Sequence, residues 1–301
     1  MSQVLEATAV KPALEPTVPR PNAVPMWQWI VVAAGTALLY NEILRKLIYD
    51  WSNNPNFSHG FLVPLFSGYV VWASRDKLAK LPSKPSVIGL VIILAALCQL
   101  VLGVLGTELF VSRTSLVLLI AGYIIYFLGW AHFRALLFPW LFLYLMIPIP
   151  AIIFNRITFP LQMLASELAS FLLPLCGVPV LREGNVIHLP AMPLEVAEAC
   201  SGIRSLMSLT TLAIVYGYFL ESKIWPRVFL ALAAIPIAVA ANALRIVGTG
   251  LMVQFWDPEK ALGFFHEFSG WVIFIVSLVL LFAVHSGMKT LVTVLTKKKT
   301  A

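Results

Sequence analysis

Long apolar runs recur along most of this 301-residue chain, and they decide which solvent the chain can fold in. Hydrophobic residues make up 60% of the sequence and charged residues only 12%, whereas a soluble domain uses about 25% charged residues to cover its surface. A stretch of about 20 apolar residues crosses the roughly 30 Å hydrocarbon core of a bilayer as a helix. We therefore predict an all-α fold, a polytopic integral membrane helix bundle.

Eight apolar runs are interpreted as transmembrane helices. They lie near residues 27–44, 60–73, 87–106, 115–130, 135–153, 203–220, 228–253 and 268–287. We assign residues 26–290 to one transmembrane domain, between a disordered cytoplasmic tail (1–25) and a basic cytoplasmic tail (291–301). The first 25 residues lack the basic start, apolar core and cleavage site of a signal peptide.

Positive charge predicts the orientation of these helices. The net charge of +7 is spread over the loops 75–84 and 221–227 and the C-terminal tail, so it does not indicate a nucleic-acid partner. Short loops rich in Lys and Arg stay in the cytoplasm. Eight crossings place all three basic segments, and both termini, in the cytoplasm.

The segment 154–202 is then predicted outside. Its first part, ITFPLQMLASELASFLLPLCG (157–177), is apolar, but a ninth crossing would move the later basic loops to the wrong side. We expect an interfacial or re-entrant helix over 157–175. Apolar residues alternate in the second part, with turn residues at 183–185, which predicts a small extracytoplasmic hairpin or loop.

The segment EVAEACSGIRS (195–205) places Cys200 just before the sixth predicted span. Ser201 and Gly202 open the turn, where free backbone N–H groups and a partial positive charge favour a thiolate. Arg204, four residues on, shares a helix face with the thiol and adds positive charge. The free N–H groups could also receive an oxyanion, and Gly202 would let a substrate backbone approach. This pattern favours a nucleophilic cysteine.

Two other roles for Cys200 stay open on local sequence alone. Cys176 is predicted on the same side, so the two could form a disulfide in an oxidising compartment. A lone cysteine is otherwise a small buried hydrophobe, which is the role we expect for Cys98 within its apolar run. Three cysteines supply neither a disulfide framework nor a metal-binding spacing. We expect no metal and no cofactor.

Two further polar residues fall at the outer ends of the last two spans. Arg245, in AVAANALRIVGTG, is costly inside a membrane helix, and Asn242 lies on the same helix face. His266, in LGFFHEFSGW, can exchange a proton at neutral pH. Singly, the arginine could snorkel and the histidine could be idle at the interface. Together with Cys200 they indicate cysteine-based acyl transfer.

These blocks resemble those of the exosortases. EACSGIRS, NALRI and a histidine at the start of the last helix follow the family's order, and NFSHGFLVPLFSGYVVW (56–72), which contains His59, is also similar. The resemblance covers residues 27–287 and implies that Cys200, Arg245 and His266 are catalytic. Substrate-binding or supporting roles are assigned to Arg204, Asn242, Ser201, Gly202 and His59.

The resemblance implies a cysteine transpeptidase or endopeptidase of the bacterial inner membrane that acts through a thioester at the periplasmic face. Its partners would be secreted proteins ending in Pro-Glu-Pro, a transmembrane helix and a basic tail, with membrane lipid and a carbohydrate or lipid acceptor. Such enzymes are associated with exopolysaccharide and biofilm production. Some carry an extra C-terminal periplasmic domain, which we expect this chain to lack.

Other functional classes were weighed beside this one. A non-catalytic component of exopolysaccharide export or assembly would use the arginine and histidine to line a sugar or lipid-carrier site. A transporter would show matched halves with corresponding helix breaks, and the sequence shows neither. A rhomboid-like serine protease would carry a Gly-x pattern before its serine, which Ser201 lacks.

The three cysteines give the first prediction. Cys200→Ala and Cys200→Ser should abolish shortening of a tailed substrate, because a serine hydroxyl lacks the low pKa of the thiol. Cys98→Ala and Cys176→Ala should stay active. The measurement is the processed fraction of a co-expressed substrate at matched membrane levels of enzyme. Equal loss in the Cys176 and Cys200 variants, with a disulfide between them by mass analysis, would contradict the nucleophile.

Overall fold

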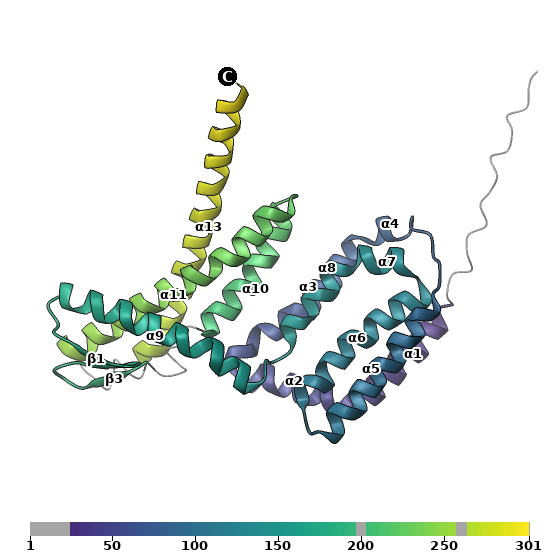
Figure 1. Cartoon of the computed structure of the whole chain (residues 1–301), viewed down its shortest axis with the longest axis horizontal. Coiled ribbons are helices and arrows are strands. Elements are labelled where there is room, and N and C mark those ends of the chain that lie inside the picture. The colour runs from purple at the N-terminus through teal and green to yellow at the C-terminus, as the bar shows by residue number, and fades with distance from the viewer. Residues whose placement is uncertain (1–24, 197–202, 257–263, 301) are drawn as a thin grey trace, which may run out of the picture.

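The computed structural model describes residues 25–196, 203–256 and 264–300 (Figure 1). Its N-terminal half contains α1 (Met26–Leu39), α2 (Asn41–Asn53), the 3₁₀ helix η1 (Pro55–Phe61), α3 (Leu62–Ala73), α4 (Arg75–Leu78), α5 (Val87–Leu105), α6 (Leu109–Phe127), α7 (Trp130–Ala135), α8 (Leu137–Phe142) and the 3₁₀ helix η2 (Leu143–Met146). Then follow α9 (Ala151–Leu175), β1 (Leu181–Glu183), β2 (Val186–His188), β3 (Pro193–Glu195), α10 (Ile203–Leu220), α11 (Ile224–Phe255) and α13 (Phe264–Thr300).

The predicted class, a polytopic helical membrane bundle, is confirmed. Within the described ranges, five helices are long and apolar enough to cross a bilayer: α5, α6, α9, α11 and the stretch Phe268–Thr296 of α13. Their outward faces carry many exposed apolar side chains, which suits a surface that meets lipid rather than water. The number of crossings stays a prediction, because helix length and composition alone do not fix it.

Two of the predicted runs differ from the helices observed. The run 27–44 is divided at Tyr40 into α1 and α2. The prediction that the run 135–153 is one helix is wrong: after the last residue of α7, the run contains α8 and η2 before α9 begins. Pro148 and Pro150 explain the last break, because a proline keeps the residue before it out of the helical conformation. The stretch 157–175 belongs instead to one continuous helix, α9.

The predicted hairpin is confirmed, and a third strand extends it. Strands β1, β2 and β3 form an antiparallel sheet in sequence order, with Leu181 opposite His188. Gly184, with φ of 64°, supplies the left-handed conformation that the tight turn requires. The buried side of the sheet presents Ile187 and Leu194 to α9 and α11, in one apolar core with Leu173. The sheet is thereby fixed to the ends of two long helices.

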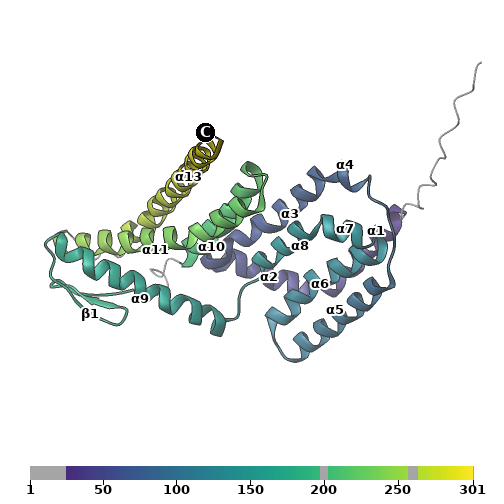
Figure 2. The ribbon, with the colours of Figure 1, turned by 45° about the horizontal axis from the view of Figure 1, so that its top comes forward.

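The basic segments lie on the same side of the molecule. In Figures 1 and 2, α4, the turn between α10 and α11, and the C-terminal end of α13 lie toward the top, and the sheet lies toward the bottom. This is the arrangement that the distribution of positive charge predicts for a cytoplasmic end and an outer end.

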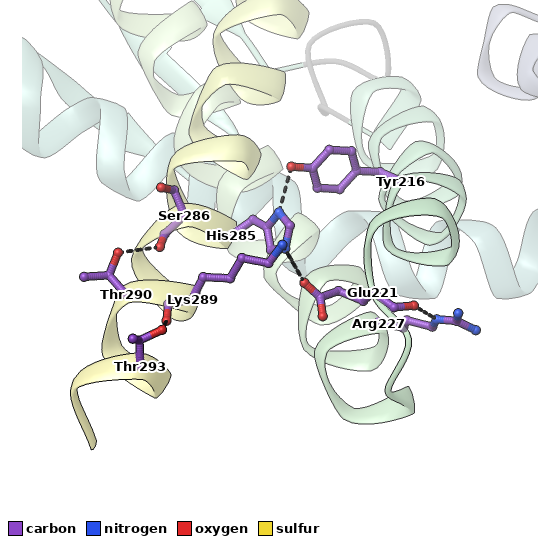
Figure 3. A network of polar contacts seen from close by, with 8 residues as sticks. All are labelled: Tyr216, Glu221, Arg227, His285, Ser286, Lys289, Thr290 and Thr293. Atoms are coloured by element: carbon purple, nitrogen blue, oxygen red, sulfur yellow. Dashed lines mark hydrogen bonds and ion pairs between the residues drawn. The ribbon is translucent and has the colours of Figure 1, made fainter. Parts of the chain in front are cut away.

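A polar cluster ties α13 to the turn between α10 and α11 (Figure 3). The Nε2 atom of His285 lies 2.7 Å from Oε1 of Glu221, and Nδ1 lies 2.7 Å from the hydroxyl of Tyr216. Lys289 places its ammonium group 3.3 Å from the same carboxylate oxygen. Arg227 donates from Nε to the backbone oxygen of Glu221 at 2.7 Å. Without this cluster α13 would have little to hold its C-terminal half, which stands away from the bundle (Figure 1).

Acidification should loosen this cluster. The hydrogen bond with His285 lowers the pKa of Glu221 below its ordinary 4.5, with Lys289 acting in the same direction. A depressed carboxyl pKa contributes stability above the unfolded-state value, and that contribution is lost as the pH falls through the folded-state value. The Tm of the detergent-solubilised protein should therefore fall below about pH 4.5, and Glu221→Gln should flatten this dependence. An unchanged pH profile would contradict it; Glu167→Gln, at an exposed carboxylate, is the control.

Close packing of α5 on α6 gives a third prediction. A Cβ on Gly89 would overlap the backbone of Tyr126, which cannot move as a flexible side chain does. Gly89→Ala should destabilise the protein by about 1–3 kcal/mol, as overpacking does. Gly68→Ala is the matched control, because nothing lies within 4 Å of the added Cβ and alanine favours a helix. Equal Tm values for the two variants in detergent would refute the close contact.

Candidate active site

A cavity of about 1180 Å³ lies between the η1–α3 segment and helices α10, α11 and α13. Its polar wall consists of Ser52, Ser58, His59, Arg204, Ser205, Ser208, Thr211 and Arg245. Its apolar wall includes Trp51, Leu62, Leu65, Phe66, Phe142, Leu212, Val215, Trp271 and Phe274. The cavity has the size of a site for a ligand or a peptide segment.

The η1 wall is held rigidly. The side chain of Asn54 caps η1 by accepting a hydrogen bond from the backbone N–H of Asn56 at 3.0 Å. Gly60 has no Cβ, and a Cβ there would overlap the ring of Trp51. Trp51 can therefore close over η1 and donate from Nε1 to the carbonyl of Met146 in η2 at 2.8 Å. This explains why the sequence has glycine directly after His59.

His59 is buried in this wall, 5% exposed. Its Nε2 lies 3.2 Å from the carbonyl oxygen of Leu145. A carbonyl only accepts, so Nε2 carries the hydrogen and Nδ1 of the neutral ring has the lone pair. Burial lowers the pKa of His59, an effect that backbone contacts with Leu145 and Asn56 partly oppose. Nδ1 is buried and makes no hydrogen bond in the described part of the chain.

The α10 wall presents one helical face. Arg204, Ser208 and Thr211 are four and then three residues apart, the spacing of neighbours on a helix. Arg204 is exposed to the cavity at the first turn of the helix. Thr211 is buried, and its hydroxyl lacks a partner among the described residues.

Arg245 reaches the cavity from α11 and is half-buried. Its Nε donates to the hydroxyl of Ser269 on α13 at 3.2 Å. Gly270 lies beside the guanidinium, where an added Cβ would make an ordinary van der Waals contact, 3.6 Å from Nη2. Asn242, one turn earlier in α11, is buried at 2% exposure. Its side chain is buried within the bundle and does not line the cavity.

The described wall contains two arginines and no carboxylate. Two guanidinium groups beside apolar and aromatic side chains favour binding of a ligand that joins an anionic group to an apolar segment. They also supply planar hydrogen-bond donors that suit a carboxylate or an oxyanion.

The profile of the transmembrane exosortase family (Exosortase_EpsH) matches residues 51–283. The chain belongs to the transmembrane exosortase family. No curated protein and no solved structure shows significant similarity to it. The matched region begins at Trp51 in the cavity wall and ends within α13, so all the cavity-lining residues lie inside the exosortase region.

The structure brings together His59, Arg204 and Arg245 of the predicted exosortase site. Cys200, Ser201 and Gly202 lie outside the described residues. His266 lies in the first turn and a half of α13, four residues before Gly270, and its side chain is outside the described part. The catalytic assignments of Cys200 and His266 therefore remain predictions.

The remaining histidines and cysteines lie away from the cavity. His188 is on β2, 3.4 Å from the carboxylate of Glu183, and His132 contacts its own helix at Leu128. Cys176 is a free, exposed thiol, so the structure does not contain the disulfide considered for it. Cys98 was expected to be buried and is exposed on α5, because that helix presents most of its surface outward.

Sequence reasoning missed Ser208, Thr211 and Ser269. For the first two a signal was present: both fall on the helix face of Arg204, at positions four and seven. Ser269 carried no such signal, because its role depends on how α13 packs against α11.

Proposed function

We propose that this exosortase is a membrane-embedded cysteine transpeptidase or endopeptidase that removes the C-terminal sorting signal of secreted proteins. The observation that carries the proposal is the meeting of His59, Arg204 and Arg245 on one cavity. Cys200 precedes Arg204 by four residues in the sequence. Together with Cys200 as the predicted nucleophile and His266 as the predicted acid, the two arginines of the cavity wall suit acyl transfer.

In the first half of the reaction, the thiolate of Cys200 attacks the scissile carbonyl carbon. The negative charge that develops on the carbonyl oxygen is stabilised by Arg245, whose guanidinium is oriented by Ser269 before substrate arrives. His266 protonates the leaving amine, and the acyl group remains on Cys200 as a thioester. Water, or an amine or hydroxyl acceptor, then releases it.

The cavity suits the tail of the expected substrate. The exposed guanidinium of Arg204 can pair with the glutamate of a Pro-Glu-Pro motif. The apolar wall formed by Trp271 and Phe274 lies on α13, whose other face is exposed. A substrate helix in the bilayer would therefore approach along α13, with membrane lipid as the surrounding solvent.

The long helix α11 supports a periplasmic site in the inner membrane. Arg227 and Arg245 are about 27 Å apart along it at 1.5 Å per residue, close to the thickness of the hydrocarbon core. With Arg227 at the cytoplasmic face, Arg245 and the cavity reach the periplasmic face. The activity would be linked to exopolysaccharide and biofilm production.

Arg245→Lys tests the proposed role of the planar guanidinium. Lysine snorkels as well as arginine but cannot make two parallel hydrogen bonds. Loss of one preorganised oxyanion donor slows chemistry about 10²–10³-fold, so processing of a tailed substrate should fall by about that factor. Arg204→Lys should be milder, since a point charge still attracts a carboxylate.

The measurement is the processed fraction over time at matched membrane levels. Arg182→Lys is the control, because Arg182 lies on β1 and bonds only to the carbonyl of Gly184 among the described contacts. Near-normal processing by Arg245→Lys would remove Arg245 from the site.

A further inference from the structure

The cavity changes from polar to apolar along its length. On α10 its wall begins at Arg204 and Ser208 and continues to Leu212 and Val215. Arg204 and Val215 are about 16 Å apart along the helix at 1.5 Å per residue, which is about half the thickness of the hydrocarbon core. In the predicted orientation, the charged end lies at the outer face and the apolar end reaches toward the middle of the bilayer.

The opposite wall has the same gradient. Ser58 lies on η1, and Leu62 and Leu65 follow on α3, which leads toward the basic helix α4. A few polar groups in an otherwise apolar site fix the orientation of its ligand. Here they select a ligand with its polar group at the membrane surface and its apolar part beneath, which is how a phospholipid lies in a bilayer.

The cavity also opens sideways, between α3 and α13. Leu62 and Leu65 are 60% and 70% exposed, and Trp271 on α13 is 73% exposed, although all three line the cavity. Side chains with that exposure form its rim. In a bilayer this rim meets hydrocarbon, so a lipid can enter without leaving the membrane. Water is the poorer occupant, because it costs about 25 cal/mol for each Å² of apolar surface that it covers.

Two guanidinium groups select the headgroup of such a lipid. No described carboxylate pairs with Arg204, and the guanidinium of Arg245 is oriented by Ser269. Phosphate oxygens accept charge-assisted hydrogen bonds from guanidinium groups, and the hydroxyls of Ser205 and Ser208 lie on the same wall as further donors. A zwitterionic headgroup would bring its own cation beside two arginines, so a lipid with net negative charge is favoured.

We propose that this cavity binds one phospholipid of net negative charge, with its phosphate at Arg204 and Arg245 and a hydrocarbon chain along Leu212 and Val215. The lipid occupies the cavity before a substrate arrives. Its displacement by the acidic motif of the substrate is the one part that rests on the proposed function. The protein thereby responds to the composition of its membrane, because a membrane richer in anionic lipid fills the site more completely.

Lipid retention by the purified full-length protein tests the site without any substrate. The protein, in a neutral detergent, is mixed with equal amounts of phosphatidylglycerol and phosphatidylcholine that carry the same acyl chains, and native mass spectrometry identifies the lipid that stays bound. One phosphatidylglycerol should be retained in preference to phosphatidylcholine. Soluble glycerol 3-phosphate at the same concentration should not displace it. Equal retention of the two lipids, or displacement by glycerol 3-phosphate, would overturn the lipid site.

Arg204→Gln tests the headgroup contact. Loss of a hydrogen-bonding charge should weaken retention of phosphatidylglycerol about tenfold or more, while Arg204→Lys should keep most of it, since an ammonium also binds phosphate. Arg182→Gln is the matched control: it removes the same charge from β1, outside the cavity wall. Equal loss in Arg204→Gln and Arg182→Gln would mean that general surface charge holds the lipid, and the proposal would fail.

Ser208→Trp tests whether the lipid lies inside the cavity. An indole at this position fills the middle of the α10 wall and should reduce retention of phosphatidylglycerol to the level of phosphatidylcholine. The Tm in lipid-free neutral detergent checks that the variant is folded. A folded variant that retains phosphatidylglycerol as the wild type does would place the lipid elsewhere and refute the proposal.

A processing assay separates this site from the proposed function. Added phosphatidylglycerol should raise the apparent KM for a tailed substrate and leave kcat unchanged, as a competing ligand does. An unchanged KM would contradict the displacement step. A wild type that retains phosphatidylglycerol but processes no tailed substrate would contradict the proposed function and leave the lipid site in place.

Discussion

Polar groups inside an apolar bundle need partners, and these pairings decide where the helices of this protein meet. Arg113 of α6 is 3% exposed and lies 2.6 Å from the carboxylate of Asp50 on α2. Arg245 joins α11 to α13 through Ser269. A charged residue at the centre of a membrane helix costs about 2.5–3.5 kcal/mol on insertion scales. Each pairing offsets part of this cost in one arrangement of the helices and so selects that arrangement.

Arg204 departs from this pattern, and the departure marks the site. It is exposed to the cavity from the first turn of α10, and no ion pair with a described carboxylate holds it. Its charge is therefore available to a ligand. The hydrogen bond to Ser269 restricts the orientation of the Arg245 guanidinium. This suits a group that must be oriented before the reaction begins.

Hydropathy predicted the class of the fold well, because lipid leaves the backbone few ways to satisfy its hydrogen bonds. It could not predict where an apolar run bends. The break at Tyr40 follows from tertiary packing, since Tyr40 is fully buried and bonds to Ser115 at 2.9 Å. The same limit applies to the fragments α8 and η2, which lie inside the apolar run 135–153.

The site was predictable where one helix sets the spacing and unpredictable where several helices meet. Counting residues along the predicted spans correctly placed Arg204 and Arg245 at the same end of the bundle. The orphaned hydroxyl of Thr211 did not, because a threonine in a helix usually bonds its own backbone, as Thr114 does here. Whether such a hydroxyl finds a partner is decided by the neighbouring elements.

The cavity wall has two guanidinium groups and no described carboxylate. An acidic substrate that binds there therefore replaces anions already attracted from the solvent. Small anions from the solvent gather near uncompensated positive charge, and an acidic substrate must displace them. Competition and screening both strengthen with ionic strength, since the Debye length shrinks from about 10 Å at 0.1 M to about 3 Å at 1 M. An anionic amphiphile enters the same competition with an apolar tail that matches Trp271 and Phe274. Detergents with acidic headgroups are thus competitors for this site as well as solvents for the protein.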